Sequence, residues 1–107
     1  MMRIDVVGRN IEVTDAIRTH AVGKVEKLTK YYDAIQQIVV TLAKEDRHHT
    51  GDFGVEIRID VERHEDFIVN AKGPDLYAVI DDAVHKGVRQ LTDHKERLKP
   101  GHHRTGG

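Results

Sequence analysis

The chain has 107 residues, no Cys or Trp, and 17 Lys and Arg side chains against 18 Asp and Glu, which gives a formal net charge of −1. This length predicts one domain, because chains divide into several domains only well beyond about 200 residues. The absence of Cys excludes disulfides, thiolate metal sites and Cys nucleophiles. No apolar run approaches the ~20 residues of a spanning helix and no secretory signal is seen, so we expect a cytoplasmic protein without membrane contact.

The first half of the chain predicts a strand, a helix and a second strand. Residues 2–8 alternate apolar and polar side chains, which is typical of a strand with Ile4 and Val6 facing inward. A helix is predicted over residues 14–32, with Thr14 as its N-cap. The β-branched run within 37–44 indicates the second strand. The apolar face of the helix consists of Ile17, Ala21, Val25, Leu28 and Tyr32.

The second half predicts a β-hairpin followed by a long helix. Residues 55–62 alternate strictly between apolar and charged side chains, and residues 67–72 form a further strand that ends at Gly73 and Pro74. The last helix is predicted from Pro74 to Lys99, where Pro100 and Gly101 end it. Its apolar line consists of Leu76, Ile80, Ala83, Gly87, Leu91 and Leu98.

The order of these elements predicts an α+β fold, a two-layer β-α-β-β-β-α sandwich. We expect a four-stranded antiparallel sheet with both helices on one face and the other face open to solvent. Residues 1–100 are predicted to form the single domain, and residues 101–107 a flexible tail.

Charge is distributed unevenly along the chain. Residues 1–32 carry a net charge of +2, residues 33–82 carry −7, and residues 83–107 carry +4. Both predicted helices lie mainly in the basic ends, whereas Glu56, Asp60 and Glu62 lie on the open face of a predicted strand. The sequence therefore predicts a basic helical layer and an acidic open sheet face.

The cationic side chains recur at helical spacing. The first helix carries a stripe that consists of His20, Lys24, Lys27 and Tyr31. The second carries Lys86, Arg89, Asp93 and Arg97, with Lys95 and Lys99 on a neighbouring line. Such rows suit an RNA backbone, because Lys and Arg bind phosphate oxygens, and Tyr31 or His20 could stack on an unpaired base. Solvated helix faces with dipole-favoured cations would explain the same pattern without a partner.

Several sequence blocks resemble one family. They occupy residues 13–18, 24–28, 31–33, 75–81, 89–91 and 94–95. On these blocks, from Met2 to about Lys99, the chain resembles the ribosome hibernation promoting factor family. This family includes the ribosome-associated inhibitor and the sigma-factor modulation proteins. The chain looks like the short form, which has no C-terminal dimerisation domain.

The resemblance implies a fold similar to double-stranded-RNA-binding domains and a role as an inhibitor of translation. Members occupy the mRNA and tRNA channel of the small ribosomal subunit during hibernation, under stress or in stationary phase, and contact ribosomal RNA. Short forms act with a separate ribosome modulation factor, which is thus a further expected partner. The RNA contacts carried over from the family are Arg18, Lys24, Lys27, Lys30, Lys86, Arg89, Lys95 and Arg97. The charge stripes add His20, Tyr31 and Lys99.

Two residues depart from the family pattern. Asp93 stands where close relatives place Lys, and its carboxylate would repel phosphate. Gly87 stands where a larger apolar residue is usual, at a helix cost of up to ~1 kcal/mol relative to Ala.

The sequence supports other functions less well. No catalytic motif is found, and the pairs His48-His49 and His102-His103 lack the spacing of metal ligands, so we expect no enzyme, metal or cofactor. Tyr77 is expected to pack against the sheet. A general duplex-RNA-binding domain is disfavoured by Asp75, Asp81 and Asp82, because such domains place basic residues there. A protein-interaction module could instead dock through the acidic sheet face. A monomer is expected off the ribosome.

Overall fold

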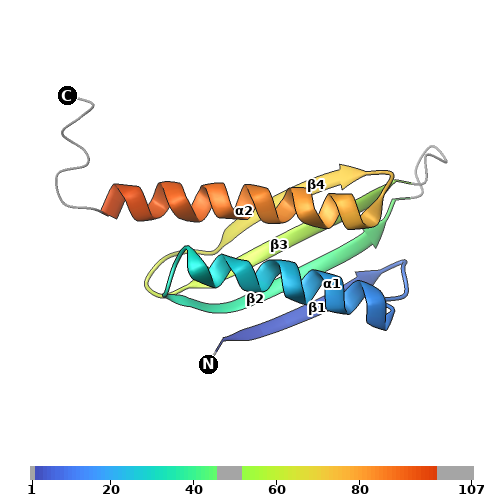
Figure 1. Cartoon of the computed structure of the whole chain (residues 1–107), viewed down its shortest axis with the longest axis horizontal. Coiled ribbons are helices and arrows are strands. Elements are labelled where there is room, and N and C mark those ends of the chain that lie inside the picture. Colours follow the sequence, from blue (N-terminus) through green and yellow to red (C-terminus); the bar gives the residue numbers. More distant parts are fainter. Residues whose placement is uncertain (1, 46–51, 99–107) are drawn as a thin grey trace.

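The computed structural model describes residues 2–45 and 52–98. Figure 1 shows the β-α-β-β-β-α order that the sequence predicted. The elements are β1 (Arg3–Arg9), α1 (Asp15–Val25), the 3₁₀ helix η1 (Glu26–Lys30), β2 (Ile35–Lys44), β3 (Phe53–Val61), β4 (Phe67–Gly73) and α2 (Leu76–Leu98). The predicted tail lies outside the described residues, as do Lys99 and the two His pairs at 48–49 and 102–103.

The sheet has the order β1-β2-β3-β4 and is mixed. The predicted hairpin of β3 and β4 is confirmed, and β2 also pairs with β3 antiparallel. The expectation of a wholly antiparallel sheet was wrong, since β1 and β2 are parallel, with Ile4 opposite Ile38. The helical crossover is the cause: α1 runs back along the sheet, so the chain enters β2 at the end where it entered β1.

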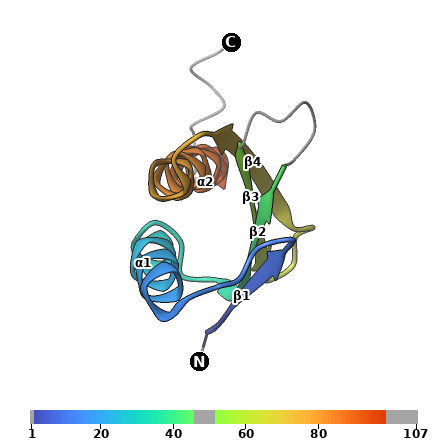
Figure 2. The ribbon, with the colours of Figure 1, turned by 90° about the vertical axis from the view of Figure 1, so that its right-hand side faces the viewer.

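Both helices lie on one face of the sheet, as Figure 2 shows, with α1 over the β1 side and α2 over the β4 side. The two-layer prediction is therefore confirmed. The inward faces of the strands and the apolar faces of the helices form one core, in which each buried Leu, Ile or Val contributes about 1.5–3 kcal/mol. Its largest fully buried side chains include Leu28, Ile38, Leu42, Ile57, Ile59, Ile80 and Leu91.

The first helix is shorter than predicted. Its start is confirmed, because Thr14 Oγ1 accepts a hydrogen bond from the Ile17 amide at 3.2 Å. At Val25, however, the α-helix gives way to η1. Here the Thr29 hydroxyl donates to the carbonyl of Glu26 at 2.8 Å, a local bond that competes with regular helix geometry.

The second helix begins after Asp75, whose carboxylate accepts from the Tyr77 amide at 3.1 Å. Its predicted apolar line is buried from Leu76 to Leu91, but Leu98 is 61% exposed. That residue was wrongly assigned to the core because the last turns of α2 extend beyond the sheet (Figure 1). None of the described helices is both long and apolar enough to cross a membrane.

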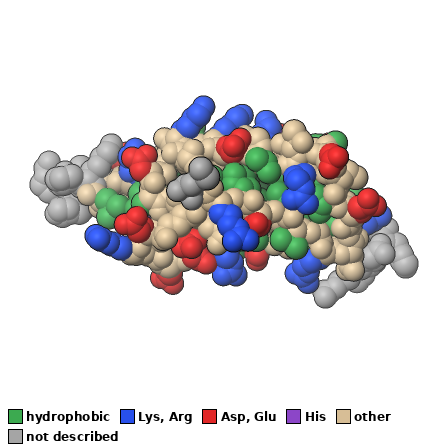
Figure 3. Space-filling model, turned by 90° about the horizontal axis from the view of Figure 1, so that it is seen from below, with side chains coloured by type: hydrophobic (Ala, Val, Ile, Leu, Met, Phe, Trp, Pro, Cys, Tyr) green, Lys and Arg blue, Asp and Glu red, His purple; other side chains and the backbone are tan. Residues whose placement is uncertain are grey.

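The open sheet face carries basic as well as acidic side chains, so the prediction of a purely acidic face opposite a basic helical layer was wrong. Alternation along the strands turns basic as well as acidic side chains to this face. They are Arg3, Arg9, Arg58 and Lys72 against Asp5, Glu56 and Asp60, and Glu62, also predicted to lie on this face, is exposed directly after the end of β3. Several are paired with opposite charges, as in Arg58 with Asp66 at 3.2 Å. Figure 3 views the molecule from the β1 edge, not onto the open face, and shows both signs interspersed around hydrophobic side chains on that edge as well.

A cluster of four rings connects the C-terminal half of α2 to the β3–β4 turn, the start of β4 and the segment after η1. The rings are those of Tyr32, His64, Phe67 and His94. His64 stacks on Phe67 with centroids 4.7 Å apart, and His94 meets the edge or face of His64, Phe67 and Tyr32 at 4.6 to 5.3 Å. Partial burial, and then the nearby His64 and Arg97, lower the pKa of His94 below its usual value. The cluster therefore favours neutral His94.

Acidification is expected to destabilise the fold through this cluster. A folded-state pKa below the unfolded value means that unfolding takes up a proton, so stability present above about pH 6.5 is lost as the pH falls through the lowered pKa of His94. Urea denaturation between about pH 7.5 and about pH 5.5 measures this loss. His94→Phe keeps a ring in the cluster but cannot titrate, and its stability should vary less with pH. Equal pH dependence in both proteins would contradict the assignment.

Gly87 allows the close approach of η1 to α2. A Cβ at this position would lie 3.3 Å from Leu28 Cδ2 and 3.4 Å from Ile59 Cδ1. We expect Gly87→Leu to lower the free energy of unfolding by about 1–3 kcal/mol through overpacking. Gly87→Ala should stay within about 1 kcal/mol of wild type, because its gain in helix propensity offsets the tight contact. Chemical denaturation distinguishes the two variants, and a more stable Leu variant would refute this packing.

Candidate nucleic-acid interface

The two helices run in the same direction (Figure 1) and enclose a groove of about 260 Å³. Lys24, Lys27 and Tyr31 line it from the first helical segment. The α2 side of the groove consists of Asp81, Val84, His85 and Val88. The groove thus combines an apolar floor, an aromatic side chain that is 41% exposed and two cations.

Asp81 is the polar centre of this interhelical groove. Its Oδ1 accepts a hydrogen bond from His20 Nε2 at 3.0 Å and lies 3.9 Å from Lys24 Nζ. The His20 ring also meets Tyr77 edge to face, with centroids 4.8 Å apart. Tyr77 therefore lies between the helices and is half exposed rather than packed against the sheet, which corrects that expectation. These contacts join one oxygen of the half-exposed Asp81 carboxylate to two side chains of α1.

Not every predicted contact on the first helix lies at this groove. Arg18 is exposed but precedes Ala21 by three residues, whereas His20 and Lys24 project from the other side of the α1 apolar face. Lys30 ends η1 and is exposed, yet it is not among the lining residues. The structure therefore brings His20, Lys24, Lys27 and Tyr31 together at the interhelical groove. It leaves Arg18 and Lys30 on other parts of the surface.

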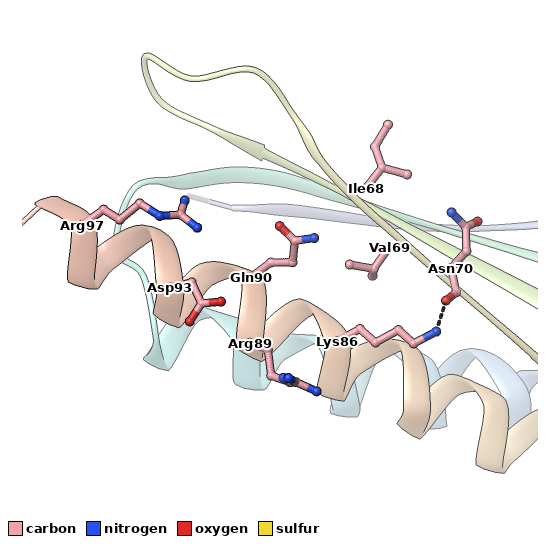
Figure 4. A pocket seen from close by; sticks show the side chains of 8 residues that line it. All are labelled: Ile68, Val69, Asn70, Lys86, Arg89, Gln90, Asp93 and Arg97. Atoms are coloured by element: carbon pink, nitrogen blue, oxygen red, sulfur yellow. Dashed lines mark hydrogen bonds between the residues drawn. The ribbon is translucent and has the colours of Figure 1, made fainter. Parts of the chain in front are cut away.

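A second groove, of about 500 Å³, lies between β4 and α2 (Figure 4). In Figure 4 Lys86, Gln90 and Arg97 extend along the side of α2 that faces β4, whereas Arg89 points away from that strand. Lys86, Gln90 and Arg97 can thus offer hydrogen-bond donors along this side of α2. The groove is lined by Ile68, Val69, Asn70, Lys86, Arg89, Gln90, Asp93 and Arg97.

Lys86 has a defined position in the second groove. Its Nζ donates to the backbone carbonyl of Asn70 at 2.6 Å, so this carbonyl points away from β3 toward the free edge of β4. An unpaired strand edge is prone to pair with other chains, and a lysine placed on it hinders that pairing. The ammonium group therefore covers the sheet edge as well as contributing positive charge.

Asp93 lies among these cations, one helical turn from Arg89 and from Arg97. Within the described residues, neither arginine comes within 4.0 Å of its carboxylate. Asp93 therefore lowers the positive potential of the groove without fixing a partner.

The cations of α2 do not form one row that faces α1. Lys86 and Arg97 lie on the β4 side, and at 100° per residue Lys95 projects from the opposite side of the helix to Lys86. Two basic grooves on either side of α2 replace the single basic layer that the sequence predicted.

Sequence reasoning missed the polar residues that complete these grooves. The sequence identified Asp81 only as one of three acidic residues that replace the basic cluster of duplex-binding domains, because its contact with His20 joins positions 61 residues apart. The helical spacing of Asp81, His85 and Val88 could have placed them on one face. Asn70 and Gln90 line one groove only because β4 packs against α2, which no local pattern indicates. Within 2–45 and 52–98, no three His, Cys, Asp or Glu side chains are grouped to hold a metal ion.

The sequence is similar to known proteins over almost its whole length. The family model described as sigma 54 modulation protein / S30EA ribosomal protein matches residues 4–99. The chain is 39% identical over 98 residues to the ribosome hibernation promoting factor of Escherichia coli strain K12, covering 92% of this chain and 98% of that protein. It is 31% identical to the factor of the same name from Azotobacter vinelandii, covering 90% of this chain and 85% of that one.

Solved structures share the fold. The N-terminal domain of Thermus thermophilus Protein Y superposes with a TM-score of 0.75 at 30% identity, covering 88% of this chain and 99% of that domain. A ribosomal subunit interface protein from Coxiella burnetii gives a TM-score of 0.78 at 20% identity, covering 88% and 98%, and shows the likeness of fold. The family match, the identity to relatives and the shared architecture agree: the chain belongs to the sigma 54 modulation protein / S30EA ribosomal protein family.

Proposed function

We propose that this protein binds the small ribosomal subunit and inhibits translation during ribosome hibernation. In this proposal it occupies the mRNA and tRNA channel, and basic residues of its helices contact ribosomal RNA. The observation that carries the proposal is the pair of grooves beside α2, each lined with cationic side chains. The relatives that align over nearly the whole chain are named ribosome hibernation promoting factors, which supports the same role.

The two grooves suit irregular, folded RNA better than a regular duplex. Cations at both sides of α2 can contact phosphates of two RNA segments, with the helix between them. Asp75 directly before α2, and Asp81 and Asp82 in its first turns, stand in place of the basic cluster that duplex-binding domains use there. Binding by Lys and Arg releases counterions from the RNA, so it should weaken as salt rises.

The proposed role is that of a binding protein, a monomer off the ribosome, that acts with a separate ribosome modulation factor. Docking through the open sheet face has less support. Its acidic side chains alternate with basic ones, and Arg3, Arg58 and Lys72 are within ion-pair distance of Asp5, Asp66 and Glu45. A basic protein partner would find no continuous acidic surface there.

Charge reversal at the grooves is expected to release the protein from ribosomes. Sedimentation with ribosomes on a sucrose gradient compares wild type with the triple variant Lys24→Glu, Lys27→Glu and Arg89→Glu. Wild type should travel with the small subunit at low salt and dissociate at high salt, since each lost phosphate contact weakens binding. The variant should stay at the top of the gradient.

A matched control carries the same charge change on the open sheet face, with Arg9→Glu, Arg58→Glu and Lys72→Glu. Circular dichroism verifies that both variants are folded. The control should sediment with ribosomes like wild type. If the control dissociates while the groove variant stays bound, the sheet face is the binding surface and the proposal is wrong.

Asp93→Lys is expected to strengthen ribosome binding. The substitution removes a carboxylate from the β4–α2 groove and adds a cation beside Arg89 and Arg97. One extra phosphate contact should steepen the slope of log affinity against log salt by about 0.7–0.9. Filter binding between about 50 mM and about 200 mM salt measures that slope. An unchanged affinity and slope would show that this groove does not face RNA, whereas Asp93→Asn should give an intermediate affinity.

A further inference from the structure

The interhelical groove has the features of a site for a single heterocyclic ring. Drug-sized ligands occupy cavities of about 300–1,000 Å³, and the groove measures about 260 Å³. Val84 and Val88 give it an apolar floor, and Tyr31 offers an aromatic face on which a base can stack. A phosphate alone would not need these surfaces.

The groove also contains an acceptor held in place. Both contacts of Asp81 are made by Oδ1, to His20 Nε2 and toward Lys24 Nζ. Its Oδ2 has no hydrogen bond within the described residues. An ionised carboxylate only accepts hydrogen bonds, so an Oδ2 that faces ring position 4 suits the amino group of cytosine and opposes the carbonyl oxygen that uracil has at the same position.

Cations flank this acceptor. Lys24 and Lys27 line the same groove, where they can bind the phosphates on either side of an inserted base. An acidic peptide would match the lysines, but it would meet the Asp81 carboxylate with like charge. Positive charge, an aromatic face and a fixed acceptor together match an unpaired nucleotide.

We propose that the interhelical groove binds one unpaired RNA base that carries an exocyclic amino group, such as cytosine, and that Asp81 selects it against uracil. Tyr31 stacks on the base, Asp81 Oδ2 accepts from the amino group, and Lys24 and Lys27 contact the neighbouring phosphates. His20 acts as a positioning residue by holding Asp81. The inference rests on the proposed function, since it specifies what one part of the RNA-binding surface recognises.

Cytidine and uridine monophosphates provide the test, because they differ at the amino group. NMR titration of the folded full chain follows the amide shifts of groove residues. We expect both nucleotides to shift the amides of Tyr31, Val84 and Val88, with cytidine bound about tenfold more tightly because a hydrogen bond to a charged group is strong. A short uridine strand with one central cytidine should bind more tightly than either monophosphate, since its flanking phosphates add contacts.

Variants separate selection from stacking. Asp81→Asn should remove the preference for cytidine, because an amide can also donate to the uracil oxygen. Asp82→Asn is the matched control: it removes the same charge from a neighbouring position outside the groove and should keep the preference. Tyr31→Ala should weaken the binding of both nucleotides, whereas Tyr31→Phe should bind them like wild type.

Four outcomes would overturn the inference. They are equal affinity for the two monophosphates, shifts confined to other surfaces, the same groove shifts with inorganic phosphate alone, and a monophosphate that binds as tightly as the strand. Any of these, together with ribosome sedimentation by wild type, would remove the base site and leave the proposed function standing. A cytidine preference in a protein that does not sediment with ribosomes would support the base site and contradict the proposed function.

Discussion

The close approach of η1 to α2 at Gly87 is the constraint on which the arrangement of the surface depends. With no side chain at this position, the end of Leu28 reaches the α2 backbone, and both lie over Ile59 of β3. This contact sets the distance between the two helices. It consequently sets the width of the interhelical groove and the side of α2 that faces β4. A residue inside the core thus determines where the exposed cations lie.

Local sequence patterns predicted the elements well, because each is amphipathic. The alternation of apolar residues in β3 and the spacing around Ala21 in α1 depend only on which face is buried. Strand direction has no such local signal. The parallel pairing of β1 with β2 follows from the path of the chain through α1. Likewise, the change to η1 is accompanied by a side-chain hydrogen bond of Thr29, which residue spacing does not reveal.

The candidate site was predictable in composition but not in geometry. Lys24, Lys27 and Tyr31 recur at helical intervals, so their common stripe could be read directly. Charge counts along the chain were misleading for the sheet, since alternation turns Arg58 and Lys72 to the same face as the acidic residues. The division of the α2 cations between two grooves depends on how the helix is rotated against the sheet. That rotation is fixed by core packing rather than by charge.

The hydrogen bond from Lys86 to Asn70 gives the Lys86 side chain two competing roles: it covers the edge of β4, and it contributes positive charge to the groove. An ammonium group engaged with a strand carbonyl is less available to a phosphate, and a phosphate that attracts it uncovers the carbonyl. In the proposed complex, the RNA itself would then shield the edge of β4. Loss of Lys86 leaves the edge bare in the free protein. The expected first consequence is therefore self-association through strand pairing, which would lower solubility independently of RNA binding.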